Sequence, residues 1–203
     1  MPVYKLTYFD VKALAEPIRM LLTYMGHEFE DVRLSFEEWS KIKSSSPFGK
    51  LPTLEIDGKV ITQSAAICRY LGREAKLAGD NPMEDMNIDI IVDTFTDFRK
   101  DISAFHHEAD PEKKEQKRQT LLKETVPYYF ERFDRIVKEN NGYLANGKLS
   151  WVDIYMLGLS DTVIAQLNDD VFEKYENLSQ WKNRIASIPS MKTWIAKRPV
   201  TRL

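Results

Sequence analysis

The hydrophobic pattern of this 203-residue chain changes once from mixed strand and helix spacing to helix spacing alone, and that change constrains the fold more than any other feature. Up to about residue 75, strand-like and helix-like segments alternate. Beyond Gly79-Asp80-Asn81-Pro82, a turn-rich break, every apolar segment has helical spacing. We therefore expect two domains, an α/β domain over residues 1–78 and an all-helical domain over residues 82–203.

The first part of the chain predicts the element order βαβ, a connection, then ββα. Its first helix begins near Pro17, which suits a first turn, and Gly26 can close it. Asp57-Gly58 separates two short strands and is the strongest short-range signal for a β-hairpin. Ser64 then offers an N-cap for the last helix. The expected strands are residues 3–9, 29–34, 53–56 and 59–61, of which 29–34 has the weakest pattern.

The second part predicts helices throughout. A long apolar stripe runs from Ile88 to Phe105. Pro127 should kink or split the next helix, because proline cannot donate the backbone hydrogen bond that a helix interior needs. Asn140-Asn141-Gly142 should end that helix, and a last helix should run from about Ser190 to just before Pro199.

Ser150 and Asp153 have the spacing of a capping box in which Asp replaces Glu. Leu149 and Ile154 occupy the positions of a hydrophobic staple around it. The helix that follows, from Trp151 to about residue 166, is mostly apolar and should lie at the centre of the helical domain. We assign these residues to folding rather than to chemistry.

Composition excludes several classes of partner. The net charge is -2 with both signs mixed along the chain, which gives no reason to expect nucleic acid or an anionic membrane. No apolar stretch approaches the roughly 18 residues of a membrane span, and the N-terminus lacks a signal-peptide pattern. The single cysteine, Cys68, excludes an internal disulfide; we expect a cytoplasmic protein in which Cys68 is a small buried residue rather than a nucleophile.

No motif for metal, nucleotide or serine-hydrolase chemistry is present, and the three histidines have no ligand spacing, so we expect no metal. Three weaker features remain. Pro52 enters a strand, which indicates either a special backbone or an ordinary loop. Gln63-Ser64 at a helix start is either an anion site or only a cap. The third feature is an aspartate ladder at helical spacing, either a solvated face relieved by Arg99 or Lys100 or a site for a cation of a ligand or partner chain: Asp89, Asp93 and Asp97.

Taken together, the chain resembles the cytosolic glutathione transferases over its whole length, and within them the sigma class. That class includes insect enzymes, haematopoietic prostaglandin D synthases and S-crystallins, and the arrangement here is most similar to the insect members. The segments that carry the resemblance are, in chain order, 4–9 (YKLTYF), 16–19 (EPIR), Trp39, 47–52 (PFGKLP), 54–58 (LEIDG), 63–64 (QS), 69–71 (RYL), 91–93 (IVD) and 97–98 (DF).

The resemblance implies a thioredoxin-like α/β domain (βαβ–ββα), an all-α domain, a homodimer and glutathione as co-substrate. Tyr8 would be the catalytic residue and would donate a hydrogen bond to the glutathione sulfur. Asp97 would bind the γ-glutamyl ammonium of glutathione in the partner chain. The remaining glutathione-binding residues implied by the family are Trp39, Lys43, Gly49, Lys50, Leu51, Pro52 (cis in the family), Gln63 and Ser64.

The resemblance also implies an apolar pocket for the second substrate between the domains, with walls at Phe9, Leu14, Arg99, Ser103 and Tyr155. Leu14 stands where vertebrate prostaglandin synthases carry arginine, and Thr96 where they add an aspartate to a cation-binding acidic cluster. We therefore expect conjugation of glutathione to neutral hydrophobic electrophiles such as lipid-peroxidation aldehydes, with some peroxidase activity. The alternatives are a non-catalytic ligand-binding or crystallin-like protein, and a prostaglandin D synthase-type isomerase.

Overall fold

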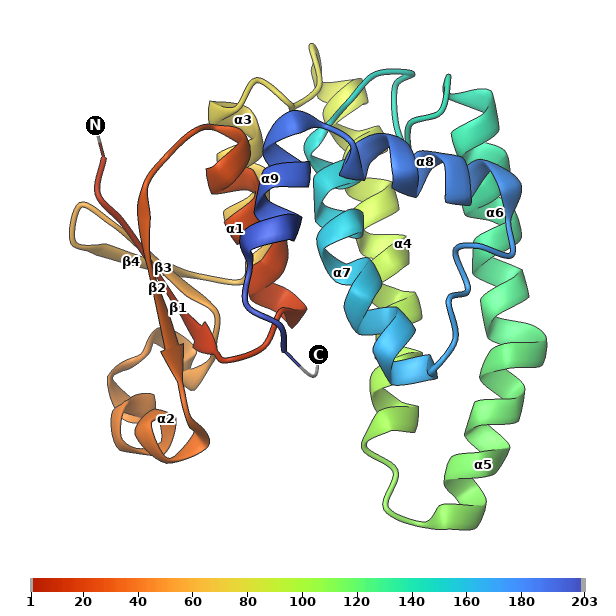
Figure 1. Cartoon of the computed structure of the whole chain (residues 1–203), viewed down its shortest axis with the longest axis horizontal. Helices are drawn as coiled ribbons and strands as arrows, with labels where there is room; N and C mark the ends of the chain where they lie inside the picture. Colours follow the sequence, from red (N-terminus) through yellow and green to blue (C-terminus); the bar gives the residue numbers. More distant parts are fainter. Residues whose placement is uncertain (1, 202–203) are drawn as a thin grey trace.

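The computed structural model describes residues 2–201 and places a small sheet beside a large group of helices (Figure 1). The strand order is β2-β1-β3-β4, with β1 parallel to β2 and the other two pairs antiparallel. The strands are β1 (Tyr4–Phe9), β2 (Phe29–Leu34), β3 (Thr53–Ile56) and β4 (Lys59–Thr62). The predicted strands are confirmed to within one residue at each end.

Side-chain alternation explains how the sheet is buried. Tyr4, Leu6 and Tyr8 are buried, whereas the residues between them are half-buried. Because successive side chains of a strand point to opposite faces, one face of β1 lies against the core. Asp57 and Gly58 both have positive φ, 49° and 85°, which is the backbone of the tight two-residue hairpin that the sequence predicts.

Two helices connect this sheet to the rest of the molecule. α1 (Glu16–Tyr24) and α3 (Ser64–Glu74) pack on each other and on α7 (Trp151–Leu167). A third helix, α2 (Phe36–Ile42), projects from the far end of the sheet (Figure 1). The sequence analysis treated that stretch only as a connection and missed α2.

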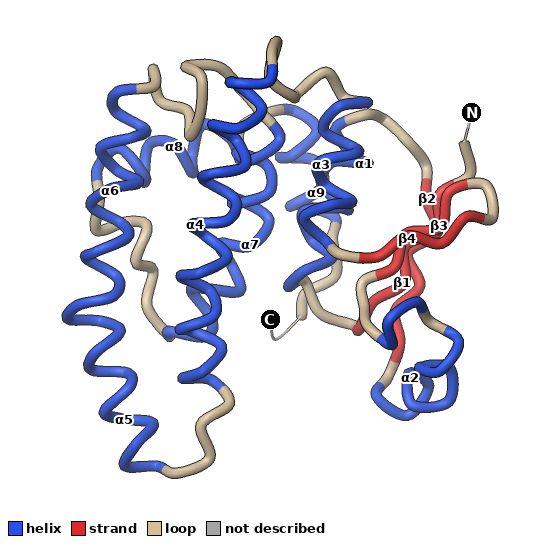
Figure 2. Tube along the Cα trace, turned by 180° about the vertical axis from the view of Figure 1, so that it is seen from behind, coloured by secondary structure: helices blue, strands red, loops and turns tan. Residues whose placement is uncertain are grey.

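The second half of the chain is helical throughout its described part. α7 lies at its centre and contacts α1, α3, α4 and α8, and most of its residues are buried. α5 and α6 form one long bent column beside α4 (Figure 2). Besides α7, the helices are α4 (Pro82–His106), α5 (Pro111–Thr120), α6 (Val126–Glu139), α8 (Glu176–Ala186) and α9 (Pro189–Lys197). None of the described helices is long and apolar enough to cross a membrane.

The bend between α5 and α6 has a local cause. Residues Leu121–Thr125 form a π-helical turn, and Pro127 follows in the first turn of α6. Since Pro127 has no backbone N–H, it cannot donate to the carbonyl one turn earlier, so regular α-helical bonding is interrupted there. The split predicted at Pro127 is confirmed.

The start of α7 is held by a fully buried carboxylate. Asp153 accepts hydrogen bonds from the Ser150 N–H at 2.8 Å and hydroxyl at 3.1 Å. It also accepts from the Leu144 N–H and from the Trp181 indole, both at 2.9 Å. Burial raises the pKa of Asp153, and these donors oppose that shift. The predicted capping box is confirmed, and it additionally ties α7 to α8.

Candidate active site

Tyr8 is the second-to-last residue of β1 and is 8% exposed. Burial raises the pKa of its hydroxyl above the usual value of 10.0. A hydrogen bond from the Leu14 backbone and the positive charges of Arg99 and Arg19 act in the opposite direction. The hydroxyl therefore stays protonated at neutral pH and is available as a hydrogen-bond donor.

The β1–α1 loop, residues 10–15, brings Leu14 to Tyr8. Its end is a 3-10 turn over Ala13–Ala15, and Ala13 has a positive φ of 34°. A side-chain-bearing residue adopts such a backbone only where its surroundings fix it. Arg19 supplies part of that support, since its Nη1 donates to the carbonyls of Val11 at 2.9 Å and Lys12 at 3.4 Å.

Aromatic contacts join Tyr8 to α2. The ring of Phe9 lies 5.6 Å from that of Tyr8, 4.6 Å from Phe36 and 6.3 Å from Trp39, measured between ring centroids. α2 begins with a capping box: the Glu38 N–H donates to the Ser35 hydroxyl oxygen, and the Ser35 N–H donates to the Glu38 carboxylate. This S-x-x-E spacing is the sequence signal that could have predicted α2 and with it the place of Trp39, but the sequence analysis did not use it.

The segment after α2 folds into two 3-10 turns that bring Lys43 close to Gly49. A β-carbon built on Gly49 would lie 3.7 Å from Cε of Lys43, and Gly49 has a positive φ of 57°. The peptide bond between Leu51 and Pro52 is cis, as the family resemblance implies. The loop residues expected to bind glutathione therefore follow one another along one short stretch before β3.

The predicted cap of α3 is wrong by one residue. Gln63, not Ser64, is the N-cap, and its side chain makes no capping hydrogen bond. Gln63 has a φ of 74°, which a residue with a β-carbon adopts only rarely. Ser64 is instead the first helical residue and is buried, so its hydroxyl and the first backbone N–H groups of α3 lie together.

The aspartate ladder of α4 is partly paired within the chain. Asp89 accepts from Arg69 of α3 at 2.9 Å. Asp97 is exposed and accepts from Lys100 at 2.7 Å, so Lys100 and not Arg99 relieves it. Asp93 is exposed. Asp97 therefore lies on the exposed surface of α4, whereas Tyr8 of the same chain is buried.

Two residues of the expected second-substrate pocket approach Tyr8 and Ser64. Arg99 is half-buried, and its charge acts on both Tyr8 and Tyr155. Tyr155 is 2% exposed, and its hydroxyl interacts with those of Ser64 and Thr96. Burial raises the pKa of Tyr155 as well. Side chains from β1, α3, α4 and α7 thus meet where the sheet adjoins the helices.

The other expected wall residues differ in setting. Leu14 is half-buried and packs against the core. Ser103 is exposed, and its hydroxyl lies 3.3 Å from Nδ1 of His107 at the end of α4. Cys68 is fully buried, and burial raises the pKa of its thiol strongly, so it is an inert thiol, in agreement with the prediction.

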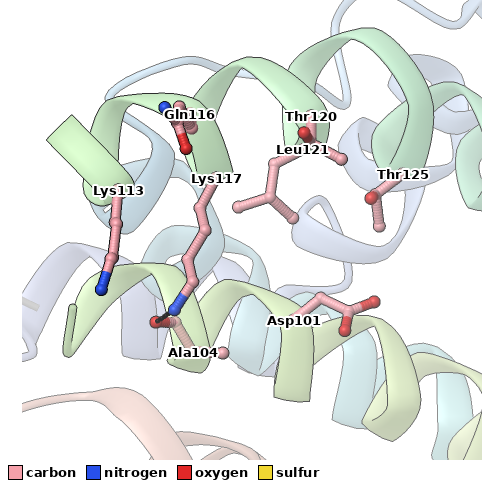
Figure 3. Close-up of a pocket in the computed structure, with 8 residues that line it drawn as sticks. All are labelled: Asp101, Ala104, Lys113, Gln116, Lys117, Thr120, Leu121 and Thr125. Carbon is pink, nitrogen blue, oxygen red and sulfur yellow. Dashed lines mark hydrogen bonds between the residues drawn. The ribbon is translucent and has the colours of Figure 1, made fainter.

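A hollow of about 450 Å³ lies elsewhere, between α4 and α5 (Figure 3). None of the residues expected to bind glutathione or its second substrate lines it. In the part of the chain that the structure describes, no three histidine, cysteine or acidic side chains are placed to hold a metal ion. The lining residues are Asp101, Ala104, Lys113, Gln116, Lys117, Thr120, Leu121 and Thr125.

The chain combines a thioredoxin-like α/β domain with an all-α domain and carries a protonated tyrosine near the end of its first strand. This arrangement is that of the two-domain glutathione transferases, and known families match both domains. The family described as "Glutathione S-transferase, N-terminal domain" matches residues 4–73, and "Glutathione S-transferase, C-terminal domain" matches residues 96–198. The chain belongs to the glutathione S-transferase family.

The individual relatives indicate that the chain is a sigma-like member of this family. Glutathione S-transferase S1 of Drosophila melanogaster is 43% identical over 98% of this chain and 80% of its own length. Hematopoietic prostaglandin D synthase of Homo sapiens is 36% identical over the full length of both chains. The solved structure of prostaglandin synthase D of Nilaparvata lugens is 48% identical, covers 98% of this chain and 100% of its own, and superposes with a TM-score of 0.94.

Proposed function

We propose that this protein conjugates glutathione, through its thiol sulfur, to hydrophobic electrophiles and that Tyr8 activates that thiol. The observation that carries the proposal is a buried tyrosine held as a neutral donor on the first strand of a glutathione transferase fold. A free thiol with a pKa of about 8.5 is only about 3% thiolate at pH 7. One donor aimed at the sulfur favours the charged form, and a charge-assisted hydrogen bond of roughly 1.5–3 kcal/mol suffices to lower the pKa by about two units.

Glutathione binds, in this proposal, along the segment from α2 to the start of α3. Lys43 and Lys50 are exposed cations for the glycine carboxylate, with Trp39 beside them. The backbone of Leu51, next to the cis Pro52, pairs with the cysteinyl part. The γ-glutamyl carboxylate meets Gln63, Ser64 and the N-terminus of α3, where free N–H groups and the helix dipole favour an anion.

We also propose a homodimer in which Asp97 completes the partner's glutathione site. Large apolar side chains are exposed at Phe48 (86% exposed), at Tyr70 of α3 and along the stripe Met83, Met86 and Ile90 of α4 (47–62% exposed). Such a surface is typical of a protein interface. Asp93 and Asp97 continue along α4 from that stripe, so a partner covering the stripe brings its own ligand within reach of these carboxylates.

The second substrate separates two candidate reactions. Leu14 offers only apolar surface near Tyr8, which favours neutral electrophiles such as lipid-peroxidation aldehydes, with peroxides as further substrates. Arg99, however, places a positive charge near Tyr8, and relatives include prostaglandin D synthases, so isomerisation of an anionic prostaglandin endoperoxide is the second candidate. In either case Phe9, Leu14, Arg99, Ser103 and Tyr155 are the proposed pocket residues.

The molecular setting of this function is part of the proposal. Residues 1–78 form the glutathione-binding domain, and residues 82–203 form the domain that supplies the hydrophobic pocket; the family matches at 4–73 and 96–198 support this division. We place the protein in the cytoplasm, because its one cysteine, Cys68, is a buried free thiol and the fold uses no internal disulfide.

One experiment tests the function and separates its alternatives. The purified protein is applied to immobilised glutathione and then assayed with an aryl halide, a panel of aldehydes and hydroperoxides, and prostaglandin H. Retention with aryl-halide and aldehyde conjugation is expected. Retention without any turnover would instead identify a non-catalytic ligand-binding or crystallin-like protein, and strong isomerisation of prostaglandin H with weak conjugation would identify the isomerase.

A further inference from the structure

The C-terminal tail returns to the start of α1. After α9 the described part of the chain passes between the sheet and the helices, beside the β1–α1 loop, as both overall views show (Figures 1 and 2). Arg198, the first residue after α9, is mostly buried there. Its Nη1 donates to Glu16 at 2.9 Å and its Nη2 donates to Asp161 at 2.5 Å, so it joins a carboxylate of α1 to one of α7.

The same two carboxylates hold the side chains that fix the β1–α1 loop. Oδ2 of Asp161, which Arg198 contacts, also accepts from Nζ of Lys12 at 3.2 Å. Glu16 accepts from Nη1 of Arg19 at 3.2 Å, and that nitrogen also donates to the carbonyls of Val11 and Lys12. Lys12 and Arg19 are therefore both paired with a carboxylate that Arg198 shares.

Charge and burial make this cluster sensitive to the loss of one member. Glu16 and Arg19 are fully buried, and Arg19 is also paired with Asp31 at 3.0 Å. The connected ion pairs comprise four cations and four carboxylates: Lys12, Arg19, Arg33, Arg198, Asp10, Glu16, Asp31 and Asp161. Removing the charge of Arg198 leaves one carboxylate in excess and takes a partner from the fully buried Glu16, where uncompensated charge is costly. Lys12 and Arg19 then shift toward Asp161 and Glu16. Because Arg19 also donates to carbonyls of the β1–α1 loop, that loop shifts with them.

We propose that Arg198 is a positioning residue for the active site: by tying Glu16 to Asp161 it fixes the β1–α1 loop and, through the Leu14 backbone, the Tyr8 hydroxyl. This inference rests on the proposed role of Tyr8. The hydrogen bond from the Leu14 backbone polarises the Tyr8 hydroxyl and makes it a stronger donor. A displaced loop weakens that donor, so the pKa of bound glutathione rises, while the other charges that act on Tyr8, Arg99 of α4 and Arg19 of α1, remain present.

The test is Arg198→Gln, compared with the wild-type protein in two measurements. The thiolate absorbance of bound glutathione is titrated against pH, and kcat and KM are measured with an aryl halide. We expect the titration midpoint to rise by about 0.5–1 pH unit and kcat/KM at neutral pH to fall about three- to tenfold. The KM for glutathione should change little, because Arg198 is not among the residues proposed to contact it. Arg198→Lys should restore only part of the effect, since an ammonium cannot bridge both carboxylates as a guanidinium does.

Lys192→Gln is the matched control, because it removes one exposed positive charge from the same C-terminal segment. Wild-type behaviour of Arg198→Gln in both measurements overturns the inference, as does a fall in melting temperature with an unchanged titration. A wild-type protein that forms no thiolate with bound glutathione refutes the proposed function instead. If Arg198→Gln does not fold, Asp161→Asn breaks the same tie from α7 and must raise the midpoint in the same way.

Discussion

At the scale of single residues, Tyr8 must be both buried and protonated to serve as a donor. Tyr8→Phe keeps the ring and its packing and removes only the hydroxyl. We expect turnover to fall about 10- to 100-fold, equivalent to about 1.4–2.7 kcal/mol, with little change in glutathione affinity. Steady-state kinetics at a pH of about 6.5, where little free thiolate exists, is the sensitive measurement.

The pH profile checks the same residue independently. Burial raises the pKa of Tyr8 above 10.0, so its proton is held as pH rises through the range in which the glutathione thiol ionises. The wild-type rate should therefore climb with thiol ionisation and show no loss from Tyr8 below about pH 10. Unchanged turnover of Tyr8→Phe would remove the role that we assign to the hydroxyl.

Substitutions at Arg99 and Leu14 are expected to shift the pKa of the glutathione thiol in opposite directions. Arg99→Leu removes a positive charge near Tyr8, so the rate–pH profile should move to higher pH by about half a unit. Leu14→Arg adds a charge next to the hydrogen-bonded backbone and should move the profile to lower pH. Arg135→Leu, an exposed arginine of α6, is the control for loss of charge alone. Identical profiles for Arg99→Leu and the wild type would show that Arg99 does not contribute to ionisation of the thiol.

At the scale of elements, the start of α7 depends on the four donors that converge on Asp153. In Asp153→Asn the amide nitrogen cannot accept, so at least one buried donor loses its partner. We expect the free energy of unfolding to fall by about 2–4 kcal/mol, measured by urea denaturation. Asp101→Asn, on the exposed face of α4, should change it by less than about 0.5 kcal/mol. Equal effects of the two substitutions would contradict the structural role of this capping box.

The elements themselves were predictable to different degrees, for identifiable reasons. Strands, the hairpin at Asp57-Gly58 and the break at Pro127 follow from local patterns that tertiary contacts do not override. α2 is only seven residues long and none of its residues is buried, so apart from Phe36, Trp39 and Ile42 at every third position only its capping box at Ser35 marks it. The start of α3 could not be placed, since nothing in a glutamine indicates the positive φ that Gln63 adopts.

Long-range contacts around the site were outside the reach of sequence patterns. The tie between Glu16 and Arg198 joins residues 182 positions apart, and the sequence offers no periodicity that links them. The charge of Arg99 near Tyr8 likewise depends on how α4 packs beside the sheet. The cis bond at Pro52 was predictable only because whole segments resemble a known family, which carries tertiary information that single residues lack. The role proposed for Tyr8 has the same origin and stays a prediction.

At the scale of the whole molecule, assembly should control glutathione binding. Ile90→Glu places a charge in the exposed apolar stripe of α4 and should shift the protein to monomers, measured by analytical ultracentrifugation. Tyr128→Glu, at an exposed aromatic of α6 outside that stripe, is the control and should leave the association state unchanged.

If Asp97 binds the ammonium of glutathione across the dimer, loss of Asp97 and loss of the dimer must weaken glutathione binding in the same way. Asp97→Ala should raise the KM for glutathione more than it lowers kcat, because the ammonium is the same in the ground and transition states. Monomeric Ile90→Glu should show at least the same increase in KM, and adding Asp97→Ala to it should cause no further loss. A normal KM in Asp97→Ala would mean that Lys100 satisfies this carboxylate and that the aspartate ladder is a solvated face. An additional loss in the double variant would place the effect of Asp97 within its own chain.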